Sequence, residues 1–484
     1  MSHPSPSTID RRGFFSLGGM SLAGLALNAM LERESKAREA GDLRGPHFKP
    51  KAKSVIWLMM RGGTSHLEGF DPKPKLNHYH GMTLGNTPFK DSVLKSPHFA
   101  NVREQVANNV IKTEVAKLCA LQKDFKRCGE LGVDVSDWWP NTRRHVDKMS
   151  IVRSMWTTDN NHGAQLQFLT GRHLLDGCFP TLGAWIHYGL GSLNENYPQF
   201  ISMGPNLYSQ CFNGLGAHYL GVEHDAVELK VDPNNPLPNS RPAVKVAKPV
   251  RSIKQRLLQQ LNAVTERQYP SDEKLRARVK AYELAFRMQS AIPKVMNFKD
   301  ETAATHKMYG LDKPLTRGFG QQLLATRRFI ERGVRFIQVF HGGGAAGAWD
   351  AHSRLIPNHN NMCGQVDLPI AGLLQDLDQR GLLDETILVW TSEFGRTPGQ
   401  QGSDGRDHHN YGFTIWMAGG GIKRGALHGA TDEIGFHAVE HRHYVTDIHA
   451  TIFHLLGLDA HKLEVPGRKR LELEFGKKID QILA

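Results

Sequence analysis

Short apolar runs recur along the chain, and each ends in glycine or in polar residues. A run without polar interruptions is typical of a central strand of a parallel sheet, because such a strand is buried on both faces. The runs are 53–60, 149–153, 199–203, 334–340, 386–391 and 414–417. Stretches with helical spacing fill most of the intervals, so the order strand, helix, strand repeats. We therefore predict an α/β fold with a doubly wound, mostly parallel sheet and helices on both faces.

Several intervals have the spacing of a helix that covers one face of a sheet. Between residues 364 and 380, apolar residues recur every three or four positions,. We expect further helices at 138–146 and 181–190. Thr446 is expected to cap a last helix, which Gly457 ends.

The stretch from about 221 to 319 differs in character from the rest. It contains a proline-rich connection, and residues 252–296 are charged and amphipathic with helical spacing,. We predict a mainly helical insertion here, within one α/β domain that spans 41–484.

Residues 1–40 have the pattern of an export signal and a linker. Arg11 and Arg12 precede a moderately apolar stretch, 14–31, that is rich in small residues. Paired arginines in this position resemble the twin-arginine signal of proteins exported in the folded state. An uncleaved membrane anchor is the alternative, although the glycines make the stretch a poor spanning helix. We expect a periplasmic or secreted protein with no stable membrane span after signal removal.

The charge balance is basic, with 60 Lys and Arg against 48 Asp and Glu, a net charge of +12. Without residues 1–40 the balance is 55 minus 44, or +11. This excess favours anionic ligands. The basic residues are scattered and no nucleic-acid-binding motif is present, so we predict no nucleic acid partner. The sequence does not indicate an oligomeric state.

Acidic residues and histidines follow three of the predicted strands. Because ligands bind beyond the carboxyl ends of strands in open α/β sheets, we expect these groups to converge. Carboxylates and imidazoles that converge from separate strands suit a divalent metal, zinc first, with manganese or calcium as alternatives. The segment 393–409 is expected to be a glycine-rich loop held between two strands. The candidate ligands are Glu68, Asp350, His352, Glu393, His408 and His409.

Other catalytic motifs receive little support. Residues 342–347 formally match the dinucleotide fingerprint GxGxxG and follow a strand, but no helix is expected to open inside them. The chain has no Walker A loop, no HExxH and no GxSxG,. We therefore predict no organic cofactor.

Six blocks of sequence resemble the exported, sulfatase-like family called domain of unknown function 1501, which is placed in the alkaline phosphatase superfamily. The blocks are GGTSHLEGFDPKP, FLTGRH, GGGAAGAWDAH, SEFGRTP, GRDHHNYGF and TDIHATIFHLLGL. The resemblance runs from about Lys51 to Lys462 and implies a phosphatase- or sulfatase-like fold with metal at the carboxyl ends of the strands. It implies that Glu68 is the acidic ligand after the first strand. Asp350 and His352 would belong to one metal position, Glu393 to a second, and His408 or His409 would be the late histidine.

The chain departs from that pattern at two places. Phe394 follows Glu393 where the sulfatase-like pattern has a histidine, which removes one expected ligand. No hydroxyl or thiol stands at the expected nucleophile position, near Asn161 and His162. The open alternatives are a metal-activated water, Thr158 as nucleophile, or His162 as nucleophile or acid/base.

Two arginines, Arg172 and Arg396, are expected to hold an anionic ester, because guanidinium fits phosphate and sulfate in a bidentate manner. We thus expect an exported metal-dependent hydrolase of phosphate or sulfate esters, with anionic polysaccharides among its substrates. The alternative is a catalytically inactive sulfatase-like binding or envelope protein.

Overall fold

The computed structural model describes residues 45–99, 109–205, 216–232, 248–269, 273–465 and 476–484. One compact unit, Pro46–Ala484, contains every element named below. The export signal that we predict in residues 1–40 lies outside the described residues.

Nine strands of the described chain form the main sheet, in the order β12-β4-β11-β8-β1-β7-β5-β6, with β15 beside β4. Only β11 runs antiparallel to its neighbours within this described sheet, β4 and β8. The strands are β1 (Ser54–Met60), β4 (Met149–Trp156), β5 (Phe200–Met203), β6 (Val227–Leu229), β7 (Phe336–His341), β8 (Thr386–Thr391), β11 (Phe413–Ala418), β12 (Ala426–His428) and β15 (His443–Tyr444). The predicted mostly parallel, doubly wound α/β fold is confirmed.

Strand β1 lies at the centre, paired in parallel with β7 and β8. Ile56, Leu58 and Met60 project into one hydrophobic core. Val55, Trp57 and Met59 project into a second core on the other face. The uninterrupted apolar sequence of β1 follows from this two-sided burial.

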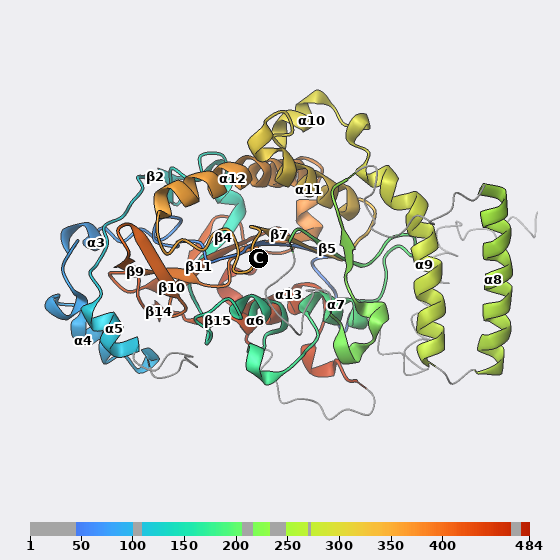
Figure 1. Ribbon diagram of the computed structural model, residues 1–484, viewed down its shortest axis with the longest axis horizontal. Helices are drawn as coiled ribbons and strands as arrows, with labels where there is room; N and C mark the ends of the chain where they lie inside the picture. The colour runs from blue at the N-terminus through green and yellow to red at the C-terminus, as the bar shows by residue number, and fades with distance from the viewer. Residues whose placement is uncertain (1–44, 100–108, 206–215, 233–247, 270–272, 466–475) are drawn as a thin grey trace, which may run out of the picture. The chain divides into compact units, whose positions relative to one another are not determined.

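Helices cover both faces of the sheet (Figure 1). α11 (Pro314–Ile330) and α12 (Leu355–Gln379) bury their apolar residues in the core beneath Ile56 and Leu58. α6 (Ala164–Thr170), α7 (Leu182–Leu190) and α13 (Val445–Leu455) contribute to the core on the opposite face. The apolar residues of these helices therefore point at the sheet from two sides, as predicted for the stretch 364–380.

The remaining elements are short or lie in the stretch between β6 and β7. That stretch contributes α8 (Lys248–Gln268), α9 (Glu273–Met296) and α10 (Ala303–Met308) before α11 begins. The others are α3 (Lys75–His78), α4 (Lys90–Leu94), α5 (Asn109–Val115), β2 (Phe125–Cys128), β3 (Val133–Ser136), β9 (Gly395–Gln401), β10 (Gly405–His409), β13 (Ala430–Thr431) and β14 (Ala438–Glu440).

The segment predicted as a glycine-rich loop after β8 is a hairpin. β9 and β10 pair antiparallel, with Arg396 opposite His408. The prediction of a loop was wrong because the paired strands are polar, so the segment lacks the apolar alternation by which a strand is recognised. The hairpin gives His408 a rigid backbone support.

Three predicted helix limits also differ. Residues 142–148 form a 3-10 helix in place of the expected helix at 138–146, since Pro140 interrupts that stretch,. α12 begins nine residues earlier than expected, at Leu355. The N-cap of α13 is Tyr444, so the predicted capping role of Thr446 was wrong.

Four strands end at the same edge of the sheet. β1, β7 and β8 are parallel neighbours, and β4 runs in the same direction because β11 is antiparallel to both β4 and β8. The chain leaving each of these strands therefore reaches one common region, as predicted from the sequence.

Candidate metal centre

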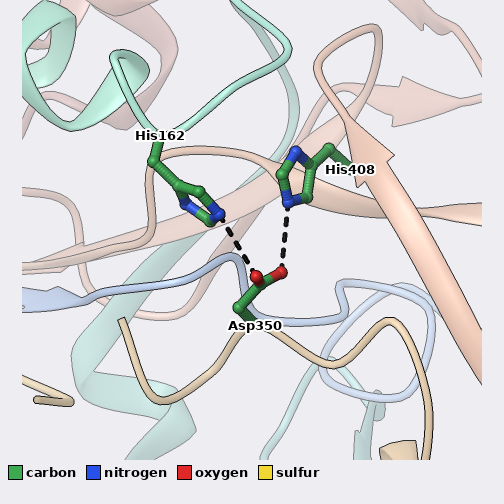
Figure 2. Close-up of side chains that lie close together, drawn as sticks. All are labelled: His162, Asp350 and His408. Carbon is green, nitrogen blue, oxygen red and sulfur yellow. Dashed lines mark hydrogen bonds and ion pairs between the residues drawn. The ribbon is translucent and has the colours of Figure 1, made fainter. Parts of the chain in front are cut away.

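An aspartate and three histidines meet beyond this edge of the sheet. Asp350 and His352 lie between β7 and α12, His162 lies between β4 and α6, and His408 lies on β10. Figure 2 shows His162 and His408 pointing at the carboxylate of Asp350 from two sides. The side chains are only partly covered, with 20% of Asp350 and 37% of His352 exposed, so solvent reaches the group.

Three atoms of the group lie at equal distances from one another. Asp350 Oδ1 is 3.0 Å from His352 Nε2 and 3.1 Å from His408 Nε2. The two Nε2 atoms are 3.0 Å apart. Ligands that surround a zinc ion at about 2.0 to 2.1 Å are separated by roughly 3 to 3.5 Å. We call Asp350, His352 and His408 the triad.

The hydrogen bonds of the other ring nitrogens fix where the protons of the triad are. His408 Nδ1 lies 2.9 Å from the carbonyl oxygen of Asn160, which can only accept, so Nδ1 carries the proton. His352 Nδ1 hydrogen bonds to Gln401 Oε1 and lies 3.5 Å from Asp407 Oδ1. In the neutral imidazoles both Nε2 lone pairs therefore face the carboxylate oxygen.

This arrangement fits a divalent cation. Three electron-pair donors that converge within about 3 Å repel one another unless a positive charge lies between them. The outward Nδ1–H groups are held by oxygen acceptors, which is the usual support of metal-ligating histidines. The donor set of two imidazoles and one carboxylate matches zinc sites that keep an open position.

Charge around the triad agrees with this assignment. Burial alone would raise the pKa of Asp350, but its interactions with His162, His352 and His408 and the charge of Arg396 hold it well below its ordinary value. Burial lowers the pKa of His408, in opposition to its interaction with Asp350. The carboxylate of Asp350 raises the pKa of His352, because a second proton on that ring would lie on Nε2 and donate to Asp350 Oδ1. Asp350 is thus ionised at neutral pH and His408 is neutral.

His162 binds the second oxygen of Asp350 and a second carboxylate. Its Nε2 lies 3.3 Å from Asp350 Oδ2 and its Nδ1 lies 3.0 Å from Glu393 Oε1. Burial alone would lower the pKa of His162, but the hydrogen bonds and charges of the two carboxylates raise it to about 9. His162 is therefore set between two anions.

Glu393 lies behind His162, away from the triad. It is fully buried, and its Oε1 accepts hydrogen bonds from Gly62 N at 2.8 Å and Gln165 Nε2 at 2.9 Å as well as from His162. Burial would raise the pKa of Glu393, but its bonds to His162 and Gln165 hold it below the ordinary value. Phe394 lies against His162 and His408, with ring centroids at 5.5 and 4.5 Å. Glu393 therefore orients His162, and the structure does not bring it to the triad as the second-metal ligand that we predicted.

Arg396 holds together the backbone segments beneath the site. The side chain is fully buried, and its guanidinium donates to the carbonyl oxygens of Gly62, Gly63, Trp349 and Arg406. Its remaining contact is an ion pair with Asp350 Oδ1 at 2.8 Å. Because carbonyl groups occupy the guanidinium, the predicted contact of Arg396 with an anionic ester is not available.

Two other predicted ligands lie outside the group. Glu68 is fully buried in an ion pair with Arg406, at 2.5 Å, and also accepts from Ser65. His409 Nε2 hydrogen bonds to the carbonyl oxygen of Phe436 at 2.6 Å, and its ring stacks on His66. Successive residues of a strand point to opposite sides, so His408 and His409 could not both face the triad.

Two predicted catalytic residues, Thr158 and Arg172, have their contacts outside the triad. Thr158 Oγ1 accepts from Gln167 Nε2 at 2.7 Å and lies 3.3 Å from the hydroxyl of Tyr444. Arg172 follows α6, and its guanidinium lies 5.4 Å from the ring of Phe179. Neither side chain has a hydrogen bond or ion pair with the triad among the described residues.

Sequence reasoning missed several partners of the triad. Asp407 can join His352 and His408 in one possible ligand group, and His162 can join Asp350 and His408 in another. Gln401 and the carbonyl of Asn160 fix the orientations of His352 and His408, and Gln165 donates to Glu393, which in turn holds His162. The only signal in the sequence was the position of Asp407 beside His408, since backbone carbonyls and amides carry no distinguishing pattern.

Two glycines allow the strand ends to meet. A Cβ at Gly62 would collide with the backbone of Asp350, and a Cβ at Gly347 would collide with the backbone of Arg61. Both have positive φ, 118° and 111°. The segment that carries Asp350 therefore lies directly on the turn after β1, which no other residue type would permit.

Comparison with known proteins gives one family and several distant structures. The family model described as "Protein of unknown function (DUF1501)" matches residues 52–483. No curated protein matches the sequence. None of the described helices combines the length and hydropathy that a membrane crossing requires.

The structural similarities are low in identity. A protein in the alkaline phosphatase superfamily from Vibrio parahaemolyticus has a TM-score of 0.37 at 9% identity, with 91% of this chain and 72% of that chain covered. The sulfatase PsFucS1 from Pseudoalteromonas sp. has a TM-score of 0.32 at 14% identity, covering 67% and 63%. The C-terminal periplasmic domain of EcEptC from Escherichia coli, in complex with Zn, has a TM-score of 0.32 at 9% identity, covering 87% and 88%.

Proposed function

The chain belongs to the DUF1501 family, and we propose that it is a metal-dependent hydrolase of phosphate or sulfate esters. The observation that carries the proposal is the triad, in which two imidazole Nε2 atoms and one carboxylate oxygen converge within 3.1 Å. The triad is partly open to solvent, so a substrate can reach it. The similarity of the sequence blocks to sulfatase-like proteins supports esters of phosphate or sulfate as the substrate class.

Zinc is the metal that the donor set favours, because imidazole nitrogens supply two of the three ligands. Calcium prefers oxygen ligands throughout and fits least well, with manganese between the two. A divalent cation held by the triad would polarise an ester oxygen, balance its negative charge and lower the pKa of a water molecule.

His162 is proposed as the residue that handles the proton. Its Nδ1 is directed at Glu393, which leaves Nε2 on the side of Asp350, whose side chain is 20% exposed. A histidine held in this way can give a proton to a leaving alcohol or take one from water. Glu393 acts through His162 as a positioning residue.

Water is the proposed nucleophile. The hydroxyl of Thr158 lies between Gln167 Nε2 and the hydroxyl of Tyr444 and has no hydrogen bond with the triad. A direct transfer to water requires no covalent intermediate on the protein.

The export route and the polymer class are also proposals. The paired arginines Arg11 and Arg12 support export through the twin-arginine route to the periplasm or beyond,. Phosphate or sulfate esters of anionic polysaccharides are substrates of a kind that an exported enzyme encounters, and the net charge of +12 favours their approach,.

The hydrogen bonds of Arg396 to backbone carbonyl groups favour a second possible function. If Arg396 cannot contact an anion and Phe394 replaces a ligand, the fold can serve as a metal-containing binding or envelope protein without turnover. The two functions differ in catalysis but share the metal.

Metal analysis of the purified protein, followed by a screen of aryl phosphate and aryl sulfate esters, separates these outcomes. We expect one zinc per chain and hydrolysis of one ester class, with both lost in Asp350→Ala. Asp384→Ala is the matched control, because the side chain of Asp384 is 74% exposed and is not part of the triad. Metal without turnover would support the binding protein, and absence of stoichiometric metal would refute both.

A further inference from the structure

Helix α8 exposes its apolar residues. The exposed fractions are 59% for Ile253, 55% for Leu257, 55% for Leu261 and 51% for Val264. At 3.6 residues per turn these four positions fall within about 80° of one another on the helix. We call Ile253, Leu257, Leu261 and Val264 the stripe. It is a continuous apolar surface on one side of the helix.

The contact of α8 with its neighbour does not explain the stripe. α8 lies beside α9 (Figure 1). Among the α8 side chains that the structure describes, the half-buried ones are Asn262, Ala263 and Thr265, which lie off the stripe. An amphipathic helix normally turns its apolar side to the protein and its small and polar residues to water. α8 does the opposite, which indicates that the stripe contacts something outside the chain.

The charge of α8 indicates the nature of that contact. The helix has five Lys and Arg against one Glu, so its net charge is five minus one, or +4. Arg256 and Arg267 are exposed, and both fall within about 60° of Ile253 on the same flank of the stripe,. Basic residues that border an apolar stripe are typical of helices that lie in the interface of an anionic membrane. A second copy of the same helix would bring like charges together and is disfavoured.

We propose that α8 binds the surface of an anionic phospholipid membrane, with the stripe inserted among the acyl chains and Arg256 and Arg267 at the headgroups. Tyr269 directly follows the helix and is 58% exposed, so an aromatic ring is available at the interface,. α8 lies on the membrane and does not cross it, in agreement with the hydropathy of the described helices. The proposal is independent of hydrolysis and gives α8, within the predicted helical insertion, the role of a membrane-contacting helix.

Co-sedimentation of the full chain with lipid vesicles tests this proposal. One set of vesicles contains phosphatidylcholine alone and the other an equal mixture of phosphatidylcholine and phosphatidylglycerol. We expect binding only to the mixture and a decrease with added salt. The double variant Leu257→Gln/Leu261→Gln should lose binding, whereas Gln259→Ala, an exposed change off the stripe, should bind as the parent does. Every variant keeps the apolar stretch 14–31, so its contribution cancels in the comparison.

A charge variant gives a second, quantitative test. Arg256→Gln/Arg267→Gln should weaken binding to the mixed vesicles about 30-fold, since each basic residue near an anionic surface contributes about a factor of five. Far-UV circular dichroism checks that the variants keep their helices. If the stripe variant fails to fold, Leu257→Trp serves instead, and its added tryptophan emission should shift to the blue with mixed vesicles only.

Three results would overturn the proposal. The first is equal binding to both vesicle types. The second is full binding by the stripe and charge variants, which would attribute attachment to another segment. The third is a dimer in light scattering that the stripe variant abolishes, which would show that a second copy covers the stripe.

Discussion

The Nε2 atoms of His352 and His408 lie 3.0 Å apart, although one residue precedes α12, the other lies on β10, and they are 56 positions apart in the chain. Each imidazole directs its Nδ1 at an oxygen acceptor, so both lone pairs face Asp350. Removal of one imidazole should leave the other two donors unable to hold a cation tightly. We expect His408→Ala to lower the affinity for zinc by more than the 10- to 100-fold typical of outer-sphere changes.

Competition with a chromophoric chelator measures that affinity. His441→Asn is the matched control, since His441 is exposed and lies outside the triad. Unchanged zinc affinity in His408→Ala would contradict the triad.

Glu393 should affect catalysis without changing the amount of metal. Glu393→Gln keeps an oxygen that can accept from Gly62 and His162 but removes the charge that orients the imidazole. We expect turnover to fall about 10- to 100-fold, with zinc still at one per chain. Steady-state kinetics beside metal analysis provides the check. Loss of one of two metal equivalents would instead show that Glu393 is a ligand of a second metal.

Glu68 should affect stability and not metal content. Its ion pair with Arg406 is fully buried on both sides. Glu68→Gln leaves the guanidinium without its anion, so we expect the free energy of unfolding to fall by roughly 3 to 5 kcal/mol. Urea denaturation measures the loss, and metal analysis of the folded variant should match the parent. A folded variant that has lost its zinc would restore Glu68 as a ligand.

Thr158 should prove dispensable for chemistry. Its hydroxyl is held by Gln167 and lies beside Tyr444. We expect Thr158→Ala to lower turnover less than about tenfold, whereas loss of a true nucleophile costs roughly a millionfold. The same ester assay decides between them, with Thr397→Ala as a control threonine of the hairpin. Complete inactivation of a folded Thr158→Ala protein would identify Thr158 as the nucleophile.

Stability should decrease in acid because buried histidines are kept neutral. Burial lowers the pKa of His449 to about 4 from an ordinary 6.5, and its Nε2 donates to the carbonyl oxygen of Phe168. The unfolded chain therefore binds a proton that the folded chain resists, so stability falls as the pH drops from about 6.5 to about 4,.

At about pH 4, the loss in the free energy of unfolding that comes from His449 alone is roughly 3 kcal/mol. His449→Gln should remove this component, since its amide can still donate to Phe168. Urea denaturation at several pH values should give a shallower decline for the variant than for the parent. Parallel declines would mean that His449 does not titrate in this range.

The strands, and the edge of the sheet at which they end, could be predicted from the sequence because both faces of β1, β7 and β8 are buried. Two-sided burial requires an uninterrupted apolar run, and such a run stands out in a chain of ordinary globular composition. The hairpin β9-β10 could not be predicted, because its strands are polar and have no apolar pattern. Its pairing is supported by Arg406, which donates to the carbonyl oxygens of Thr397 and Pro398.

Position along the chain predicted which side chains approach the edge, but not the direction in which each points. Asp350, His352 and His408 were expected to converge, and the structure brings them together. The side chain of Glu68 points away from the triad and forms an ion pair with Arg406. His409 points to the opposite side of its strand from His408, because successive residues of a strand alternate in direction. The outcome for Glu68 depends on a competing partner that lies 338 positions away.

The ligands of the triad come from segments that follow β7 and β9, and their support comes from the loop after β4, nearly 250 residues earlier. A nascent polypeptide that ends before His408 does not contain all three ligands. The triad can therefore bind a metal only after these segments have been synthesised and have folded together. Under the proposed export of the folded chain, the cytoplasm would determine which ion is loaded, through the free concentrations of competing metals there. The compartment of synthesis would then select the cofactor of the proposed hydrolase, which would work in another compartment.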